Sequence, residues 1–253
     1  MQQTNRCKFC GYKKKLIKAH IIPEGFYRQI RSEKNVLKIL NNNKDFPKRS
    51  PIGIYDENIL CKDCDGIFAD WDNYAQTLLT NNPKDAIPKI KDEVIVGYEI
   101  SQYKYDLLKL FFISLLWRAS ITNHDFFAKI DLGPFESIAK NHIERREPGS
   151  ANDFSVILSK FELPKDTKAF ILDPHLEKWD QINFYRIYLG IYVVYIKVDK
   201  RKTTGLFEKF MLKPNLPFCI IQRDILNSKE LSLIHDIINV SKATTNNNKP
   251  DLK

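Results

Sequence analysis

Residues 58–65 read Asn-Ile-Leu-Cys-Lys-Asp-Cys-Asp, and residues 7–10 read Cys-Lys-Phe-Cys. Each stretch holds two cysteines separated by two residues, a spacing at which a tight turn directs two thiolates at one point. Two such pairs in one chain are typical of a tetrahedral zinc site with four sulfur ligands. We therefore predict that one structural Zn²⁺ joins these two distant stretches. The predicted ligands are Cys7, Cys10, Cys61 and Cys64.

Two other interpretations of the paired cysteines agree less well with the sequence. A disulfide framework is unusual in a chain of 253 residues whose polar N-terminus shows no secretory signal. A thioredoxin-like redox motif would be a single pair beside a βαβ unit, which the flanking sequence does not provide. The fifth cysteine, Cys219, lies in an apolar run and is expected to pack as a small hydrophobic residue.

The positive charge of the chain is concentrated at its N-terminal end. The net charge is +9, and residues 1–50 contain 13 Lys and Arg but only three Asp and Glu, whereas the other 203 residues are close to neutral. A basic module followed by a neutral body favours a polyanionic partner such as nucleic acid. A membrane surface, an acidic protein or a solvated surface without a partner also fits the charge alone.

No apolar run approaches the roughly 20 residues that a bilayer span needs. The longest are Leu107–Trp117, which is interrupted by polar residues, and Ile187–Ile196. We therefore expect a soluble, cytoplasmic protein without a membrane partner.

The segment between the cysteine pairs carries a histidine in a short apolar run. Residues 16–27 read Leu-Ile-Lys-Ala-His-Ile-Ile-Pro-Glu-Gly-Phe-Tyr. The run has β character and ends at Pro23, which has no N–H to donate to a strand partner. After the second pair, Phe68, Trp71 and Ala75 recur at helical spacing and are expected to form a buried stripe rather than a base-stacking surface.

This order of parts (cysteine pair, strand with His20, loop, Asn58, cysteine pair, helix) resembles the HNH (ββα-metal) endonucleases of the zinc-ribbon subtype. The resemblance covers residues 7–75. It implies a metal-dependent nuclease that cleaves phosphodiester bonds, in DNA rather than RNA, with His20 as the general base that activates water. It further implies that Asn58 orients the histidine or its loop, and that a divalent cation assists cleavage. Because a hard cation such as Mg²⁺ or Mn²⁺ accepts carboxylate oxygens, Asp65 is the candidate ligand for this catalytic ion.

The resemblance also implies a biological setting. Proteins of this build often belong to bacterial defence or mobile-element systems, in which a nuclease works beside a sensor or ATPase subunit. A protein partner of that kind is therefore a further expectation.

Two features of the chain depart from the family pattern. Ala19 stands where an Asp or His usually binds the catalytic metal, and the helix after Cys64 carries no histidine. The alternative is therefore a catalytically degenerate zinc-ribbon module that binds nucleic acid or a protein. In that interpretation His20 is a polar residue at a strand end, and Asp65 stabilises the first turn of a helix through the helix dipole.

Hydrophobic periodicity predicts an α+β fold for the whole chain. Tyr103–Ile121 is the strongest helix, with a broad apolar stripe. Tyr185–Val198 is predicted as one central strand, in which Gly190 marks a bulge or a close contact. The C-terminal region shows no catalytic motif and reads as a scaffold, oligomerisation or partner-docking domain. The predicted divisions are a zinc-binding HNH-like module (1–80), a linker or loop (81–100), an α+β domain (101–240) and a disordered tail (241–253).

Overall fold

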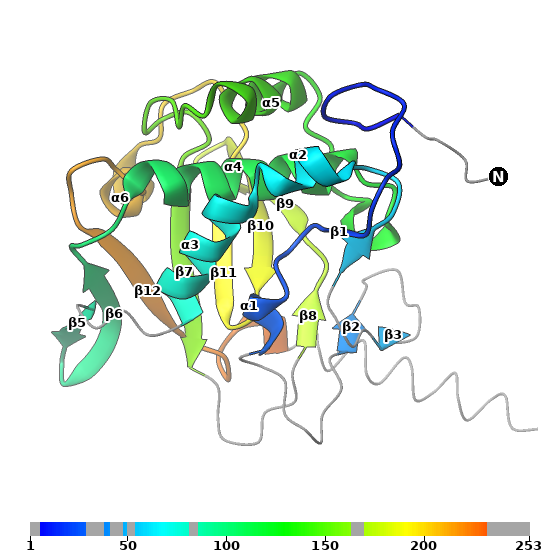
Figure 1. Cartoon of the computed structure of the whole chain (residues 1–253). Helices are drawn as coiled ribbons and strands as arrows, with labels where there is room; N and C mark the ends of the chain where they lie inside the picture. The colour runs from blue at the N-terminus through cyan, green and yellow to red at the C-terminus, as the bar shows by residue number, and fades with distance from the viewer. Residues whose placement is uncertain are drawn as a thin grey trace, which may run out of the picture.

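The structure of the protein is a computed structural model that describes residues 6–28, 38–40, 48–49, 54–80, 86–162 and 170–231. The fold is mixed α+β, as the sequence predicts. Helices α3 (Ala69–Thr80) and α4 (Tyr105–Ile121) cross one face of a large sheet, and the cysteine-bearing segments lie at the end of these helices (Figure 1). The predicted tail 241–253 lies outside the described residues.

The remaining elements complete this framework. The other helices are α1 (Gly25–Arg28), α2 (Lys62–Gly66), the 3-10 helix η1 (Asp125–Phe127), α5 (Phe135–Arg145) and α6 (Gly205–Phe210). The strands are β1 (Ala19–His20), β2 (Lys38–Leu40), β3 (Lys48–Arg49), β4 (Tyr55–Asp56), β5 (Ala86–Lys91), β6 (Val94–Ile100), β7 (Val156–Glu162), β8 (Phe170–Leu172), β9 (His175–Trp179), β10 (Ile182–Leu189), β11 (Tyr192–Lys197) and β12 (Phe218–Asp224).

The large sheet has the order β5-β6-β12-β7-β11-β10-β9. The adjacent strands β12 and β7 run parallel to each other. Because successive side chains of a strand point to opposite faces, the sheet divides the core into two parts. Val194 and Ile196 pack on the face covered by α4, whereas Val193 and Tyr195 pack on the other face with Phe207 of α6. Strands β10 and β11 are buried on both faces of the sheet, which explains the long apolar run Ile187–Ile196 in the sequence.

The predicted central strand over 185–198 is wrong in one respect, because the chain turns back on itself within it. Strands β10 and β11 form an antiparallel hairpin in which Leu189 pairs with Tyr192. Gly190 has a φ of +64°, a conformation that glycine adopts without steric cost, so it marks a tight turn rather than a bulge.

The predicted linker over 81–100 is also wrong where the structure describes it. Residues 86–100 form the β5–β6 hairpin at one edge of the sheet. Its turn residues Asp92 and Glu93 both have positive φ, which Gly and Asn usually supply. Pro88 and the exposed side chains of β5 are consistent with an edge strand, where a missing N–H is tolerated.

One hydrophobic core connects the cysteine-bearing region to the body of the protein. Phe9, between the first two cysteines, makes edge contacts with Phe68 and Trp117, with ring centroids 6.0 and 5.4 Å apart. Trp117 lies on α4, so the central helix packs directly against both cysteine-bearing segments. The division into separate domains stays a prediction, but the contacts show that these segments share buried surface.

Helix α4 confirms the predicted helix and is apolar on nearly all sides, as expected for a helix buried within a domain. Its length and apolar character do not suffice for a bilayer span, nor do those of any other helix among the described residues. Two basic side chains, Lys109 and Arg118, are nevertheless buried within it. Each must therefore find polar partners inside the protein.

Lys109 is expected to make the stability of the protein depend on pH. Its ammonium donates a hydrogen bond of 2.8 Å to the carbonyl of Phe154. Burial lowers the pKa of this ammonium to about 7, although the nearby charge of Asp153 acts to raise it. Because the unfolded chain keeps this proton up to about pH 10.5, the free energy of unfolding should rise with pH between about 7 and 10.

The matched experiment compares the wild type with Lys109→Met in urea at pH 7 and pH 9.5. The wild type should gain about 3 kcal/mol relative to the variant over this interval. Parallel pH profiles of the two proteins would show that Lys109 titrates normally.

Candidate metal centre

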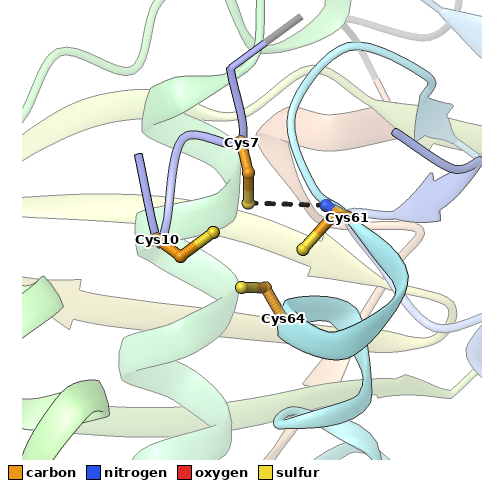
Figure 2. A group of neighbouring side chains, drawn as sticks. All are labelled: Cys7, Cys10, Cys61 and Cys64. Atoms are coloured by element: carbon orange, nitrogen blue, oxygen red, sulfur yellow. Dashed lines mark hydrogen bonds between the residues drawn. The ribbon is translucent and has the colours of Figure 1, made fainter. Parts of the chain in front are cut away.

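Four cysteine side chains from two distant segments converge at one point (Figure 2). We call Cys7, Cys10, Cys61 and Cys64 the cysteine cluster. Their sulfur atoms all lie within 4.8 Å of one another. This confirms the prediction that the two distant cysteine pairs come together at one point. The cysteines are free thiols rather than disulfides.

Backbone hydrogen bonds hold the two segments of the cluster together. The first is a turn in which the N–H of Gly11 donates to the carbonyl of Cys7 at 2.8 Å, and the φ of +74° at Gly11 is one that favours glycine. The second segment pairs with the first, because the N–H of Lys8 donates to Ile59 and the N–H of Cys61 donates to the Cys7 sulfur at 3.4 Å. An N–H directed at a sulfur atom favours a thiolate there.

The electrostatics of the cluster favour a bound cation. Burial opposes ionisation of Cys7, but the backbone N–H groups of Cys10, Cys61 and Phe9 outweigh it and lower its pKa to about 7. Burial and the neighbouring thiols raise the pKa of Cys64 well above its usual value. One thiolate therefore forms readily, whereas further negative charge at the same point needs a cation to stabilise it.

The donor set fits a metal such as zinc. Zinc binds thiolate sulfur at about 2.3 Å, which places the sulfur atoms of a tetrahedral site about 3.8 Å apart. The spread of up to 4.8 Å within the cluster is close to this geometry. Three members of the cluster are buried and Cys10 is partly exposed, so an ion has a route into the site. Such an ion would join residues 7–10 to the start of α2 as a structural cross-link.

Next to the cluster, His20 lies on a pair of very short strands. β1 and β4 are antiparallel, with Ala19 opposite Asp56 and His20 opposite Tyr55. The His20 ring makes an edge contact with the Tyr55 ring, with centroids 6.3 Å apart. Its Nε2 atom is buried and has no hydrogen-bond partner among the described residues. A buried ring nitrogen without a partner is unusual, because most buried polar atoms make at least one hydrogen bond.

Asp65 and Asn58 occupy different surroundings. Asp65 lies in α2 directly after Cys64, and its pKa is raised, chiefly by burial and also by Asp72, although the charges of Arg118 and His20 act to lower it. The carboxylate and the imidazole are therefore close enough to interact electrostatically. Asn58 is exposed in the turn after β4, and its backbone N–H donates to Asp56 at 2.8 Å. Asn58 thus belongs to the loop beside His20.

Sequence reasoning missed that Arg118 and Asp72 support the backbone of His20. Arg118 of α4 donates to the His20 backbone carbonyl at 3.0 Å. The same guanidinium makes two hydrogen bonds with the carboxylate of Asp72, at 2.6 and 2.8 Å. Residues 72 and 118 are 46 positions apart in the sequence, so no local periodicity connects them. The one sequence signal was an arginine inside a largely apolar helix.

The ligands for a second metal are fewer than in the family pattern. Across the described parts of the chain, the cysteine cluster is the one group of three or more His, Cys, Asp or Glu residues arranged to hold an ion. Ala19 is fully buried and offers no ligand atom. Near His20, Asp65 is therefore the candidate carboxylate ligand for a second ion.

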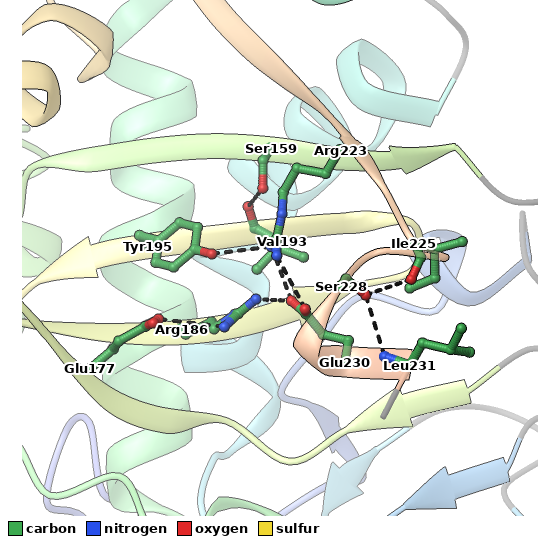
Figure 3. A network of polar contacts seen from close by, with 10 residues as sticks. All are labelled: Ser159, Glu177, Arg186, Val193, Tyr195, Arg223, Ile225, Ser228, Glu230 and Leu231. Atoms are coloured by element: carbon green, nitrogen blue, oxygen red, sulfur yellow. Dashed lines mark hydrogen bonds and ion pairs between the residues drawn. The ribbon is translucent and has the colours of Figure 1, made fainter. Parts of the chain in front are cut away.

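A second polar cluster connects strands of the large sheet with residues 228–231 (Figure 3). Arg223 makes two hydrogen bonds with Glu230, at 3.0 and 3.1 Å, and one with the Tyr195 hydroxyl at 3.2 Å. Arg186 forms ion pairs with Glu230 and Glu177. Two arginines and two glutamates thus neutralise one another, which is the arrangement of a structural network that holds residues 228–231 on the sheet.

Glu230→Gln is expected to lower the free energy of unfolding by about 3 kcal/mol, because it leaves the buried guanidinium of Arg186 and the half-buried guanidinium of Arg223 without their shared carboxylate. Glu144→Gln is the control, since Glu144 pairs with Lys140 on the surface of α5 and should contribute less than about 0.5 kcal/mol. Urea denaturation of both variants checks the comparison. Equal, small losses would mean that the network contributes no net stability.

Comparison with protein-family models, with curated proteins and with solved structures gave no match to this chain.

Proposed function

We propose that the protein is a metal-dependent nuclease of the HNH type that cleaves phosphodiester bonds in DNA. The observation that carries the proposal is the partner-free, buried Nε2 of His20, held on a strand pair beside the cysteine cluster. In this proposal Zn²⁺ at the cluster is structural. Asp65 contributes to a Mg²⁺ or Mn²⁺ site, and Asn58 orders the adjacent loop.

The chemistry assigned to His20 is general-base catalysis. Its imidazole accepts a proton from water, the water oxygen forms a bond to phosphorus, and the bond between phosphorus and the leaving sugar oxygen breaks. A proton from solvent completes the leaving alcohol. A divalent cation, when bound, would stabilise the negative charge that develops on the phosphate oxygens.

Exposed lysines near His20 supply contacts for a nucleic-acid backbone. Lys13, Lys15 and Lys18 are exposed in the segment that leads into β1. The Lys18 ammonium lies 3.8 Å from the centre of the Tyr55 ring, which in turn contacts the His20 ring. Each phosphate that such a group neutralises releases counterions, so binding should weaken steeply as salt rises. Binding that is insensitive to salt would point instead to a protein partner.

A plasmid-nicking assay tests the proposal directly. The full chain is incubated with supercoiled DNA, or with RNA of matched length, in Mg²⁺, in Mn²⁺ and in chelator. Metal-dependent nicking of DNA is the expected result. Absence of cleavage under every metal would leave the enzyme proposal without support.

The second candidate is a zinc-stabilised binding module without activity. It is favoured by buried Ala19 and by the small number of metal ligands near His20. This candidate predicts salt-sensitive DNA binding without nicking. The role in bacterial defence and a sensor or ATPase partner belong to the proposal through the family resemblance alone.

A further inference from the structure

Arg118 is the most completely enclosed charged group beside the candidate site. It lies on α4, its side chain is 1% exposed, and its guanidinium lies 4.9 Å from the centre of the Phe68 ring. Burial of a charge without partners costs several kcal/mol. The partners observed are Asp72, the His20 carbonyl and groups of Ser114 one turn earlier in α4.

These contacts join three elements that are distant in sequence. One nitrogen of Arg118 donates both to the His20 carbonyl at 3.0 Å and to Asp72 at 2.8 Å, while the other donates to Asp72 at 2.6 Å. His20 belongs to β1, Asp72 to α3 and Arg118 to α4. The planar guanidinium thereby fixes the backbone of β1 relative to two helices.

The strand pair needs such support. β1 and β4 are only two residues long, and a short, isolated strand pair is at best marginally stable in water. The position of His20 therefore depends on contacts outside the pair. The bond from Arg118 reaches the residue that carries the imidazole itself.

The geometry points to Arg118 and Asp72 as a positioning pair for His20, an inference that rests on the proposed nuclease function. Neither residue is assigned contact with substrate, because Arg118 is buried. Their role is to hold the His20 backbone so that the imidazole keeps one orientation toward the scissile phosphate. Small displacements of a catalytic group reduce rates by up to about a hundredfold.

The test uses Arg118→Lys and Asp72→Asn in the full chain. Lysine keeps the charge but loses the planar, two-point contact, so the effect of geometry is separated from that of charge. Asp173→Asn is the control, because it breaks an ion pair between the buried Asp173 carboxylate and the exposed Lys129 elsewhere in the structure. Three quantities are measured for each protein: kcat and KM for nicking, bound zinc, and the imidazole NMR signal of His20, assigned with His20→Ala.

We expect Arg118→Lys and Asp72→Asn to lower kcat at least about tenfold, with KM and zinc content unchanged and the His20 signal shifted. Asp173→Asn should leave all three quantities as in the wild type. A wild-type kcat together with an unmoved His20 signal in Arg118→Lys would overturn the inference. If the wild type does not cleave at all, the proposed function fails, while the His20 signal still decides whether Arg118 and Asp72 position that residue.

Discussion

Replacing Cys64 by serine is expected to abolish zinc binding and to unfold the cysteine-bearing region. The variant keeps the size of the side chain but removes one of four thiolate ligands. Structural zinc sites contribute roughly 10 kcal/mol or more of apparent binding free energy. We therefore expect the free energy of unfolding to fall by at least about 4 kcal/mol. Loss of this region would also uncover Phe68 and Trp117, which it shields from water.

The experiment measures bound zinc by elemental analysis and stability by urea denaturation. Cys219→Ser is the matched control, since Cys219 is a partly exposed residue of β12 outside the cysteine cluster. It should retain zinc and lose little stability. A Cys64→Ser protein with wild-type stability and zinc content would rule out a role for the cluster in metal binding.

Replacing His20 by alanine is expected to reduce nicking by about a hundredfold to ten-thousandfold, the usual contribution of a general base. DNA affinity should change little, because the lysines that contact phosphates remain. The cysteine cluster is untouched, so zinc content should equal that of the wild type. The effect should therefore appear in kcat rather than in KM.

The control for this variant is His142→Ala. His142 lies on α5, where its Nδ1 is 2.9 Å from the Glu147 carbonyl, and the proposal gives it no part in catalysis. Nicking rates and DNA binding by fluorescence anisotropy are compared for the three proteins. Undiminished cleavage by His20→Ala would remove His20 from the mechanism.

The cysteine cluster and the central helix could be predicted from the sequence because their signals are local. Two cysteines at fixed spacing place two sulfur atoms together regardless of the rest of the fold. The apolar spacing of 105–121 likewise indicates a buried helix without reference to its partners.

The hairpins were harder to predict because their turns carry weak sequence signals. Asp92 and Glu93 adopt positive φ between β5 and β6, and Gly190 and Ile191 form the turn between two largely apolar strands. In both places the sequence carries no Asn-Gly or Asp-Gly signal. The pairing of Arg118 with Asp72 could not be predicted for a different reason, since it depends on how α3 and α4 pack in space.

The residue types of the candidate site could therefore be predicted from the sequence, whereas the tertiary contacts that hold His20 could not. Spacing and family resemblance selected His20 and Asp65, which the structure places within electrostatic reach of each other. Burial of Nε2 and the contacts of Arg118 depend on tertiary packing, which one sequence does not encode in any short pattern.

X-ray absorption at the zinc edge of the purified full chain tests the central claim most directly. One zinc ion per chain with four sulfur neighbours at about 2.3 Å is the expected result. Mixed nitrogen or oxygen ligation, or a metal-free protein whose cysteines remain reduced and whose fold is intact, would contradict it.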